Sequence, residues 1–336
     1  MTFNQIINDL KNKIYYPVYM LTGEEPYYID QISDFIENNV LTDGEKEFNQ
    51  SIIYGRDVDV PTIVSYAKRY PMMANYQVVI VKEAQDLDKP KPKIEELISY
   101  VEKPLPSTIL VINYKYKKID GRKKFAKLIA KKGVFFESKK IYENQVQGWI
   151  TGYIEKQGLR VTPKASALLA EYLGLDLGKI VNEIGKLTIN LQPGSEINDM
   201  LIEKNIGISK DYNIFELQEA ISRRDILKAN QIINYFAANP KDNPLVKTII
   251  LLYGYFSKVL MYHRLKDKSR SNAAASLNVN PFFLKGYELA ARNYSIAKVV
   301  KIISYLREYD LKAKGVDNIS ATDGELYKEL MYKILH

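Results

Sequence analysis

The sequence predicts an α/β domain with a parallel sheet, followed by all-α domains. Two observations lead to this prediction. Up to about residue 140, short apolar runs typical of strands alternate with amphipathic helices, which indicates βαβ units. Beyond that point the strand signals stop and only helical periodicity remains. With 336 residues and 46% hydrophobic content, the chain is long enough to form two or three domains.

The first domain is predicted to contain about five strands. The run 78–81, Val-Val-Ile-Val, is continuous and short, which is typical of a strand buried on both faces of a sheet. A capping box at Thr2 and a proline at position 26 mark the starts of two helices. The expected strands are 17–21, 51–54, 77–81, 108–112 and 134–136, and the expected helices are 3–10, 26–39, 61–70, 94–102 and a lysine-rich helix before residue 134.

The rest of the chain is predicted to be helical. We expect a small helical domain over residues 141–210 and a larger one over 211–336. On the long helix near 245–265, Tyr253, Tyr255 and Phe256 are expected to pack inside the larger domain. The expected helices are 143–156, one from 163, 176–190, 214–222, 225–236, 245–265 and three more before the end of the chain.

The composition argues against several kinds of function. There are no cysteines, so disulfides and thiolate metal sites are absent. His263 and His336 are the only histidines, which argues against a histidine-based catalytic triad or zinc site. We find no apolar run long enough to span a bilayer and no secretory signal at the N-terminus. The cytoplasm is therefore the expected location, with no membrane partner, metal or disulfide.

Positive charge is concentrated in residues 115–132. This segment holds nine Lys or Arg residues against one acid, Asp120, so its net charge of +8 equals that of the whole chain. A concentrated basic patch is expected beside nucleic acid or another polyanion. A solvated, lysine-rich helix face explains the same pattern equally well.

The first strand, turn and helix have the framework of a P-loop but lack its residues. A P-loop needs a longer glycine-rich loop, a lysine for the phosphates and a Ser or Thr for magnesium. Here the turn is Thr22-Gly23-Glu24-Glu25-Pro26, in which two carboxylates would repel phosphate. After the third strand, Glu83 stands alone behind Lys82 where acidic groups would position metal and water. We therefore expect a nucleotide-binding fold that does not hydrolyse nucleotide and holds no cofactor.

Two adjacent methionines lie in the turn before the strand at 77–81. Two large side chains, Met72 and Met73, cannot both point easily from one turn into the same core. An unbranched thioether suits the apolar pocket of a partner. The alternative is that both methionines pack under the sheet, where methionine usually lies.

Five stretches, in order, resemble the delta subunit family of the bacterial DNA polymerase III clamp loader. Each motif alone is moderately specific, but five in the right order form a strong resemblance that spans essentially the whole chain. The last of them, Asp-Leu-Lys-Ala-Lys-Gly, matches the C-terminal signature of the family closely. The stretches are 18–27, 121–137, 169–187, 214–225 and 310–315.

The resemblance implies an AAA-type module in three parts. These are a RecA-like α/β domain with a degenerate P-loop over 1–140, a small helical lid over 141–210 and a helical collar for oligomerisation over 211–336. It implies a non-catalytic subunit of a DNA-directed DNA polymerase (nucleotidyltransferase) holoenzyme, which opens the sliding clamp for loading onto primed DNA without hydrolysing ATP. The implied partners are the clamp (beta subunit), the ATPase subunits (gamma/tau) and the delta-prime subunit through the collar, and primer-template DNA.

The resemblance also implies binding residues. In the family, a Leu-Phe pair ahead of the third strand enters a pocket of the clamp. The aligned pair here is Met72-Met73, which departs from that pattern, so Tyr76 is an alternative source of the aromatic contact. The basic segment is expected to contact DNA phosphates without reading sequence. Its candidate residues are Lys117, Lys118, Arg122, Lys123, Lys124 and Lys127.

Two other interpretations of the sequence stay open. The first is a stand-alone DNA-binding protein that uses residues 115–132 and shows salt-dependent DNA affinity. The second is an active ATPase with an unusual P-loop, against which the missing lysine argues.

Overall fold

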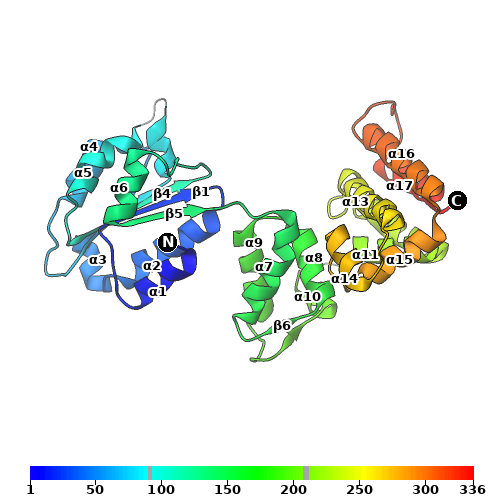
Figure 1. Ribbon diagram of the computed structural model, residues 1–336, viewed down its shortest axis with the longest axis horizontal. Coiled ribbons are helices and arrows are strands. Elements are labelled where there is room, and N and C mark those ends of the chain that lie inside the picture. The colour runs from blue at the N-terminus through cyan, green and yellow to red at the C-terminus, as the bar shows by residue number, and fades with distance from the viewer. Residues whose placement is uncertain (90–92, 207–211) are drawn as a thin grey trace. The chain divides into compact units, whose positions relative to one another are not determined.

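The computed structural model describes residues 1–89, 93–206 and 212–336. Contacts within the chain divide it into two compact units, Met1–Tyr142 and Glu143–His336 (Figure 1). The predicted boundary at residue 140 is close to this division. The second predicted boundary, at residue 210, lies outside the described residues.

A five-stranded parallel sheet forms the centre of the first unit, as predicted. Its strand order is β2-β3-β4-β1-β5, so β1 and β4 lie in the interior of the sheet. Both are almost wholly buried, which explains their continuous apolar sequences. In the register of these strands, Met20 lies beside Ile112 on one side and Phe135 on the other. The strands are β1 (Val18–Gly23), β2 (Gln50–Tyr54), β3 (Gln77–Lys82), β4 (Thr108–Lys115) and β5 (Val134–Ser138).

Helices cover both faces of this sheet (Figure 1). Side chains alternate along each strand, so Tyr19 and Leu21 face one layer while Val18 and Met20 face the other. The first layer contains α1 (Phe3–Lys11) and α2 (Pro26–Asn39), and the second contains α4 (Val60–Ala67), α5 (Ile98–Glu102) and α6 (Lys124–Lys132).

Local capping signals predicted helix starts well, whereas some helix lengths were wrong. Thr2 and Gln5 form the expected capping box of α1. Helix α4 ends at Ala67 and not at Tyr70. Beyond Ala67 the chain closes with a 3₁₀-type hydrogen bond across three residues, from the Arg69 amide to the Tyr66 carbonyl. The predicted helix 94–102 is a 3₁₀ segment (Ile94–Leu97) followed by α5. Two short elements were not predicted: α3 (Asp43–Asn49) and a 3₁₀ segment (Ala84–Asp88).

The second unit begins with a group of short helices and a two-stranded parallel ladder. Thr162 and Asp176 cap two of these helices through their side chains. The tryptophan predicted to lie on a helix does so, and Trp149 stacks on Tyr153 with ring centroids 5.2 Å apart. The elements are α7 (Glu143–Glu155), β6 (Arg160–Val161), α8 (Pro163–Leu173), α9 (Leu177–Thr188), β7 (Glu196–Ile197) and α10 (Asp199–Ile206).

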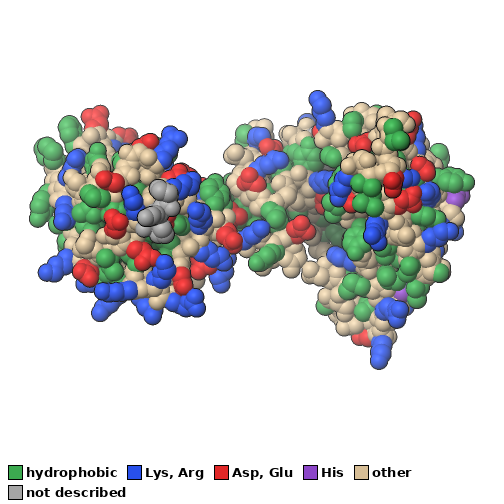
Figure 2. Space-filling model, turned by 90° about the horizontal axis from the view of Figure 1, so that it is seen from above, with side chains coloured by type: hydrophobic (Ala, Val, Ile, Leu, Met, Phe, Trp, Pro, Cys, Tyr) green, Lys and Arg blue, Asp and Glu red, His purple; other side chains and the backbone are tan. Residues whose placement is uncertain are grey.

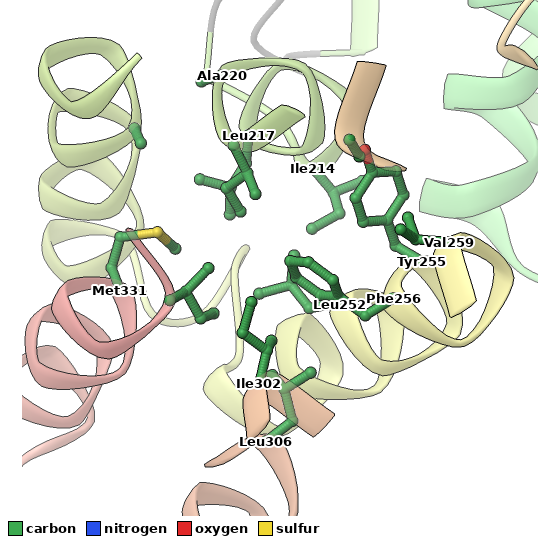
Figure 3. Packing of buried hydrophobic residues seen from close by; sticks show 14 of the residues in the cluster. Ile214, Leu217, Ala220, Leu252, Tyr255, Phe256, Val259, Ile302, Leu306 and Met331 are labelled. Atoms are coloured by element: carbon green, nitrogen blue, oxygen red, sulfur yellow. The ribbon is translucent and has the colours of Figure 1, made fainter. Parts of the chain in front are cut away.

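Seven helices complete the second unit around a large apolar core (Figure 3). Leu217, Phe256 and Leu306 come from three different helices and meet in this core. Four helices follow α13, not the three predicted, because the short, alanine-rich α14 has little hydrophobic periodicity. The helices are α11 (Ile214–Arg223), α12 (Ile226–Ala238), α13 (Leu245–Arg264), α14 (Arg270–Leu277), α15 (Leu284–Asn293), α16 (Ile296–Ala313) and α17 (Asp323–Leu335).

Helix α13 is the main apolar element of this core. Tyr255 and Phe256 are buried as predicted, but Tyr253 is 52% exposed, which corrects its predicted core position. Tyr253 is two residues from Tyr255, a rotation of about 200° around the helix, so the two side chains leave opposite faces. Among the described residues, α13 is the helix long and apolar enough to cross a membrane, which corrects the expectation that no apolar run reaches this length, although eight of its residues are buried in the unit. Its apolar composition is that expected of a core helix.

Candidate functional site

The turn between α4 and β3 exposes both predicted methionines. The side chain of Met72 is 63% exposed, and that of Met73 is fully exposed. The backbone of Met73 has φ of 53°, in the left-handed region that non-glycine residues seldom adopt. The interpretation of both side chains as core residues is therefore wrong. Their role as anchors for a partner stays a prediction.

A buried amide from α3 holds this turn in place. Asn49 is 1% exposed, and its Nδ2 donates to the carbonyl oxygen of Met72 at 2.9 Å. The amide nitrogen of Met72 donates back to Asn49 Oδ1 at 2.6 Å. Asn49 Nδ2 also donates to the carbonyl oxygen of Glu45 at 3.0 Å, which ties the turn to the last residues of α3. The role of Asn49 was not predictable from the sequence, because the contact joins residues 23 positions apart and has no local signal.

An open hollow lies between α3 and the methionines. Its volume is about 340 Å³. Phe48 contributes an aromatic wall and is itself 65% exposed, although it lies next to the buried Asn49. The lining residues are Thr42, Gly44, Glu45, Phe48, Met72 and Met73.

Tyr76, the third predicted anchor, lies in a different environment. It is half-buried and packs against the apolar layer of α1 and α2. Its ring meets that of Tyr15 edge-on, with centroids 5.3 Å apart. Burial raises the pKa of Tyr15, and Tyr76 raises it further. The structure thus exposes two of the three predicted anchors and packs Tyr76 against the layer of α1 and α2.

The turn that corresponds to a P-loop has its polar groups occupied by the chain itself. The amide of Gly23 donates to the carbonyl oxygen of Lys117 at 2.9 Å, and the amide of Glu24 donates to that of Ser138 at 3.0 Å. The Thr22 hydroxyl also donates to Lys117 O, at 3.1 Å. In a P-loop such amides face phosphate. Here they are not available to it.

Close packing and a helix cap complete this turn. Gly23 has φ of 138°, and a Cβ at this position would lie 2.0 Å from the carbonyl oxygen of Ser138, so only glycine fits. Glu25 caps α2, with its Oε1 accepting from the Tyr27 amide at 3.0 Å. Glu25 therefore serves as a helix cap, and Glu24 lies 3.7 Å from Lys118 at the surface.

Ion pairs fill the carboxyl edge of the sheet, where a nucleotide would bind in a fold of this kind. Lys115 Nζ lies 2.7 Å from Asp30 Oδ1 and 3.2 Å from Glu83 Oε1. Burial alone would lower the pKa of Lys115, but its bonds to the two carboxylates outweigh burial and raise it. Lys82 pairs with Glu37 at 2.9 Å. Among the described residues, no three His, Asp or Glu side chains are grouped as a metal site would require.

The basic segment divides into a paired part and an unpaired part. Lys118 lies 3.7 Å from both Glu24 and Glu137, and Arg122 and Lys123 pair with Asp120 and Glu95, respectively. All of these precede the helix, which begins only at Lys124. The lysine-rich helix predicted before residue 134 is present as α6, but it holds only the second half of the basic segment, because β4 extends to Lys115 and a loop follows it.

The lysines on α6 itself differ from those of the loop. They form no ion pair with any acid among the described residues, and α6 contains no acidic residue of its own. Figure 2 shows Lys and Arg side chains gathered along one edge of the first unit. The unpaired lysines are Lys124, Lys127, Lys131 and Lys132. Of the predicted phosphate contacts, Lys124 and Lys127 on α6 and the exposed Lys117 in the loop form no ion pair among the described residues, and so have the free charge that such a contact needs.

The fold and these sites define a class of protein. It is a parallel α/β domain followed by helical domains, in which the turn that corresponds to a P-loop is filled by the chain's own carbonyl groups, ion pairs line the carboxyl edge of the sheet, and an apolar turn is exposed.

Comparisons with known proteins agree on one family. The family described as "DNA polymerase III, delta subunit" matches residues 19–139, and the family described as "DNA polymerase III delta subunit, C-terminal domain" matches residues 211–329. The chain is 28% identical over 313 residues to DNA polymerase III subunit delta of Bacillus subtilis (strain 168), covering 91% of this chain and 90% of that protein. The chain belongs to the DNA polymerase III delta subunit family.

A solved structure shares the whole fold. The Bacillus subtilis DNA clamp loader delta protein superposes with a TM-score of 0.57 at 24% sequence identity, covering 99% of both chains. The fold class predicted from the sequence is confirmed by this match and by the observed sheet.

Proposed function

We propose that this clamp-loader subunit binds the sliding clamp and opens its ring for loading onto primed DNA, without hydrolysing ATP itself. The observation that carries this proposal is the pair of exposed methionines, Met72 and Met73, on a turn that Asn49 holds rigid. A large apolar side chain that is fully exposed on an otherwise ordered turn is well suited to a partner's pocket.

Ring opening on this proposal is a shift of population and involves no bond chemistry. A protein that binds the open ring more tightly than the closed ring raises the open population by the ratio of the two affinities. Full burial of each methionine contributes about 1.5–3 kcal/mol. The two anchors therefore give affinity, and the preference for the open ring comes from a broader surface around residues 60–85.

The absence of ATP hydrolysis is supported by the turn at Thr22–Pro26. The amides of Gly23 and Glu24 already donate to carbonyl oxygens of the chain. Lys115, a partly buried lysine at the carboxyl edge of the sheet, is paired with Asp30 and Glu83. A phosphate would have to displace all of these bonds at once.

The other proposed partners follow from the collar and from α6. Exposed apolar residues on α13, such as Ile250, Tyr253 and Met261, are suited to packing against the ATPase subunits (gamma/tau) and delta-prime. The unpaired lysines of α6 are suited to the phosphates of primer-template DNA in the assembled complex. The proposed location is the cytoplasm, where replication takes place.

Binding of the purified chain to its own sliding clamp tests the proposal. We expect the double variant Met72→Ala/Met73→Ala to lose about 2 kcal/mol or more of binding free energy, as interface hot spots do. Circular dichroism checks that the variant is folded. Unchanged affinity would move the contact away from this turn, and failure of the wild-type chain to bind would remove the clamp-opening proposal.

A second candidate function is a stand-alone DNA-binding protein, which the unpaired lysines of α6 favour. It requires tight, strongly salt-dependent DNA binding by the isolated chain and no affinity for the clamp. The clamp-opening proposal requires the opposite, so one pair of binding measurements distinguishes the two.

A further inference from the structure

We infer that Phe48 is a third contact with the clamp. On this inference the two proteins interlock: Met73 enters a pocket of the clamp, and an apolar side chain of the clamp enters the hollow beside Phe48. This inference rests on the proposed function. It adds helix α3, which has no clear signal in the sequence, to the binding surface.

Exposure is the first reason. Phe48 leaves 65% of its surface in water on a helix whose next residue, Asn49, is buried. A short helix of seven residues gains little from exposing a phenylalanine, since exposed apolar area lowers solubility and adds no stability. Aromatic side chains are enriched at the centres of interfaces, where they give large contact area at low entropic cost.

Rigidity is the second reason. At its start, α3 is fixed by Glu45, whose Oε2 accepts from both the amide and the hydroxyl of Thr42 at 2.8 Å. At its end, α3 is fixed by the bonds between Asn49 and Met72. Phe48 and the methionines are therefore held in one fixed arrangement before binding. Preorganisation of this kind reduces the entropy lost on association.

The shape of the surface identifies the occupant. Met72 and Met73 form part of the wall of the hollow, so a partner that covers the methionines must also cover the hollow. Its volume of about 340 Å³ is at the low end of ligand pockets, which span roughly 300–1,000 Å³. Thr42 and Glu45 on the rim already hydrogen-bond to each other, so covering them leaves few polar groups unpaired. The sliding clamp is the partner proposed for the methionines, and it is therefore the partner of the hollow.

Clamp binding by the full-length Phe48→Ala variant tests the inference. We expect Kd to rise about tenfold, as for an aromatic interface residue. Phe48→Met, which keeps a large apolar side chain, should restore most of the affinity. The matched control is Tyr116→Ala, because Tyr116 is 61% exposed in the same unit. Tyr116 follows the carboxyl end of β4, whereas the methionine turn precedes the amino end of the parallel strand β3, so the two lie at opposite edges of the sheet. Thermal unfolding of each variant confirms that it is folded.

A labelling experiment gives an answer that does not depend on affinity. The chain has no cysteines, so Phe48→Cys and Tyr116→Cys each introduce one thiol. We expect saturating clamp to slow alkylation at position 48 by about tenfold or more and to leave position 116 unchanged.

The outcomes separate the inference from the proposed function. If Met72→Ala/Met73→Ala loses clamp binding while Phe48→Ala binds normally and position 48 stays reactive, the inference is wrong and the proposed function stands. If the wild-type chain does not bind the clamp, both are wrong.

Discussion

The side-chain amide of Asn49 hydrogen-bonds to both the amide nitrogen and the carbonyl oxygen of Met72, at 2.6 and 2.9 Å. A single buried side chain thereby satisfies both backbone hydrogen-bonding groups of Met72, as a neighbouring strand would in a sheet. The support is needed because Met73 adopts a left-handed conformation, which costs about 1–2 kcal/mol for a residue with a side chain. Asn49 thus links the stability of the first unit to the presentation of its apolar turn.

Replacement of Asn49 should therefore affect both stability and binding. In Asn49→Ala, the Met72 backbone groups lose their partners, and we expect a loss of about 1–3 kcal/mol in the free energy of unfolding. Clamp affinity should fall as well, because the methionines are no longer held in place. Urea unfolding and clamp titration measure the two effects.

Asn49→Asp is the matched variant for this experiment. Its carboxylate still accepts from the Met72 amide but has no proton to donate to the Met72 carbonyl. We expect a loss of stability about as large as in Asn49→Ala, because a carboxylate facing a carbonyl oxygen is repelled. Wild-type stability in both variants would show that the two hydrogen bonds do not support the turn.

A second prediction concerns nucleotide binding. We expect no detectable binding of Mg-ATP to the full-length chain by equilibrium titration, because the amides of Gly23 and Glu24 are already bonded. Introducing a lysine, as in Glu25→Lys, should not create binding, since the missing lysine is only one of several defects. Removal of the Glu25 cap should cost about 1 kcal/mol of stability. Saturable ATP binding by either protein would contradict this view of the turn.

Local sequence signals predicted the framework of the protein better than its surface. The strands and the helix starts at Thr2 and Pro26 were predictable, because apolar runs, capping residues and prolines at the first helical position act within a few positions. The hydrogen bonds between Asn49 and the Met72 backbone were not predictable, because they join residues 23 positions apart. Helix α3 was missed because only seven residues form it, too few for a periodic pattern.

Long-range ion pairs limited the prediction of the basic segment in the same way. The count of nine basic residues gave no indication that Lys123 would pair with Glu95, 28 positions away. Nor did it indicate that Lys115 would lie between Asp30 and Glu83. Net charge is a property of composition, whereas free charge depends on the fold.

The partly buried position of Lys115 between two carboxylates predicts a pH dependence of stability. Folding raises the pKa of Lys115 above its usual 10.5, because Asp30 and Glu83 outweigh the effect of burial. Its contribution to stability is therefore complete below pH 10.5 and is lost as the pH rises through the higher folded value. We expect Lys115→Met to lower stability by about 1–3 kcal/mol at neutral pH, because two carboxylates lose their partner.

Urea unfolding from neutral pH to above pH 10.5 measures this effect. The difference between wild type and Lys115→Met should shrink at the alkaline end, where the wild-type lysine also loses its charge. A difference that stays constant with pH would indicate that packing of the lysine stem, and not its charge, stabilises the first unit.

The division of the basic segment predicts unequal effects on DNA binding. With the assembled loader and primer-template DNA, Lys124→Ala/Lys127→Ala/Lys131→Ala should lower affinity and reduce the salt dependence by about 0.9 per lost phosphate contact. The comparison variant, Lys118→Ala/Arg122→Ala/Lys123→Ala, removes charges that are already paired within the chain. Its effect should be smaller. Equal effects of the two triple variants would show that DNA displaces the internal pairs.

Two aromatic residues on α13 allow the stability of the C-terminal helices to be tested separately from their proposed assembly with other loader subunits. Phe256 is wholly buried between helices, so Phe256→Ala should cost about 3–5 kcal/mol of unfolding free energy through the cavity it creates. Tyr253 is 52% exposed on the same helix, so Tyr253→Ala should change stability by less than about 0.5 kcal/mol. If its exposed face contacts the other loader subunits, Tyr253→Ala should nevertheless weaken assembly with them, as measured by size-exclusion chromatography of the mixed subunits. Normal assembly of a stable Tyr253→Ala chain would place the collar contact on another face.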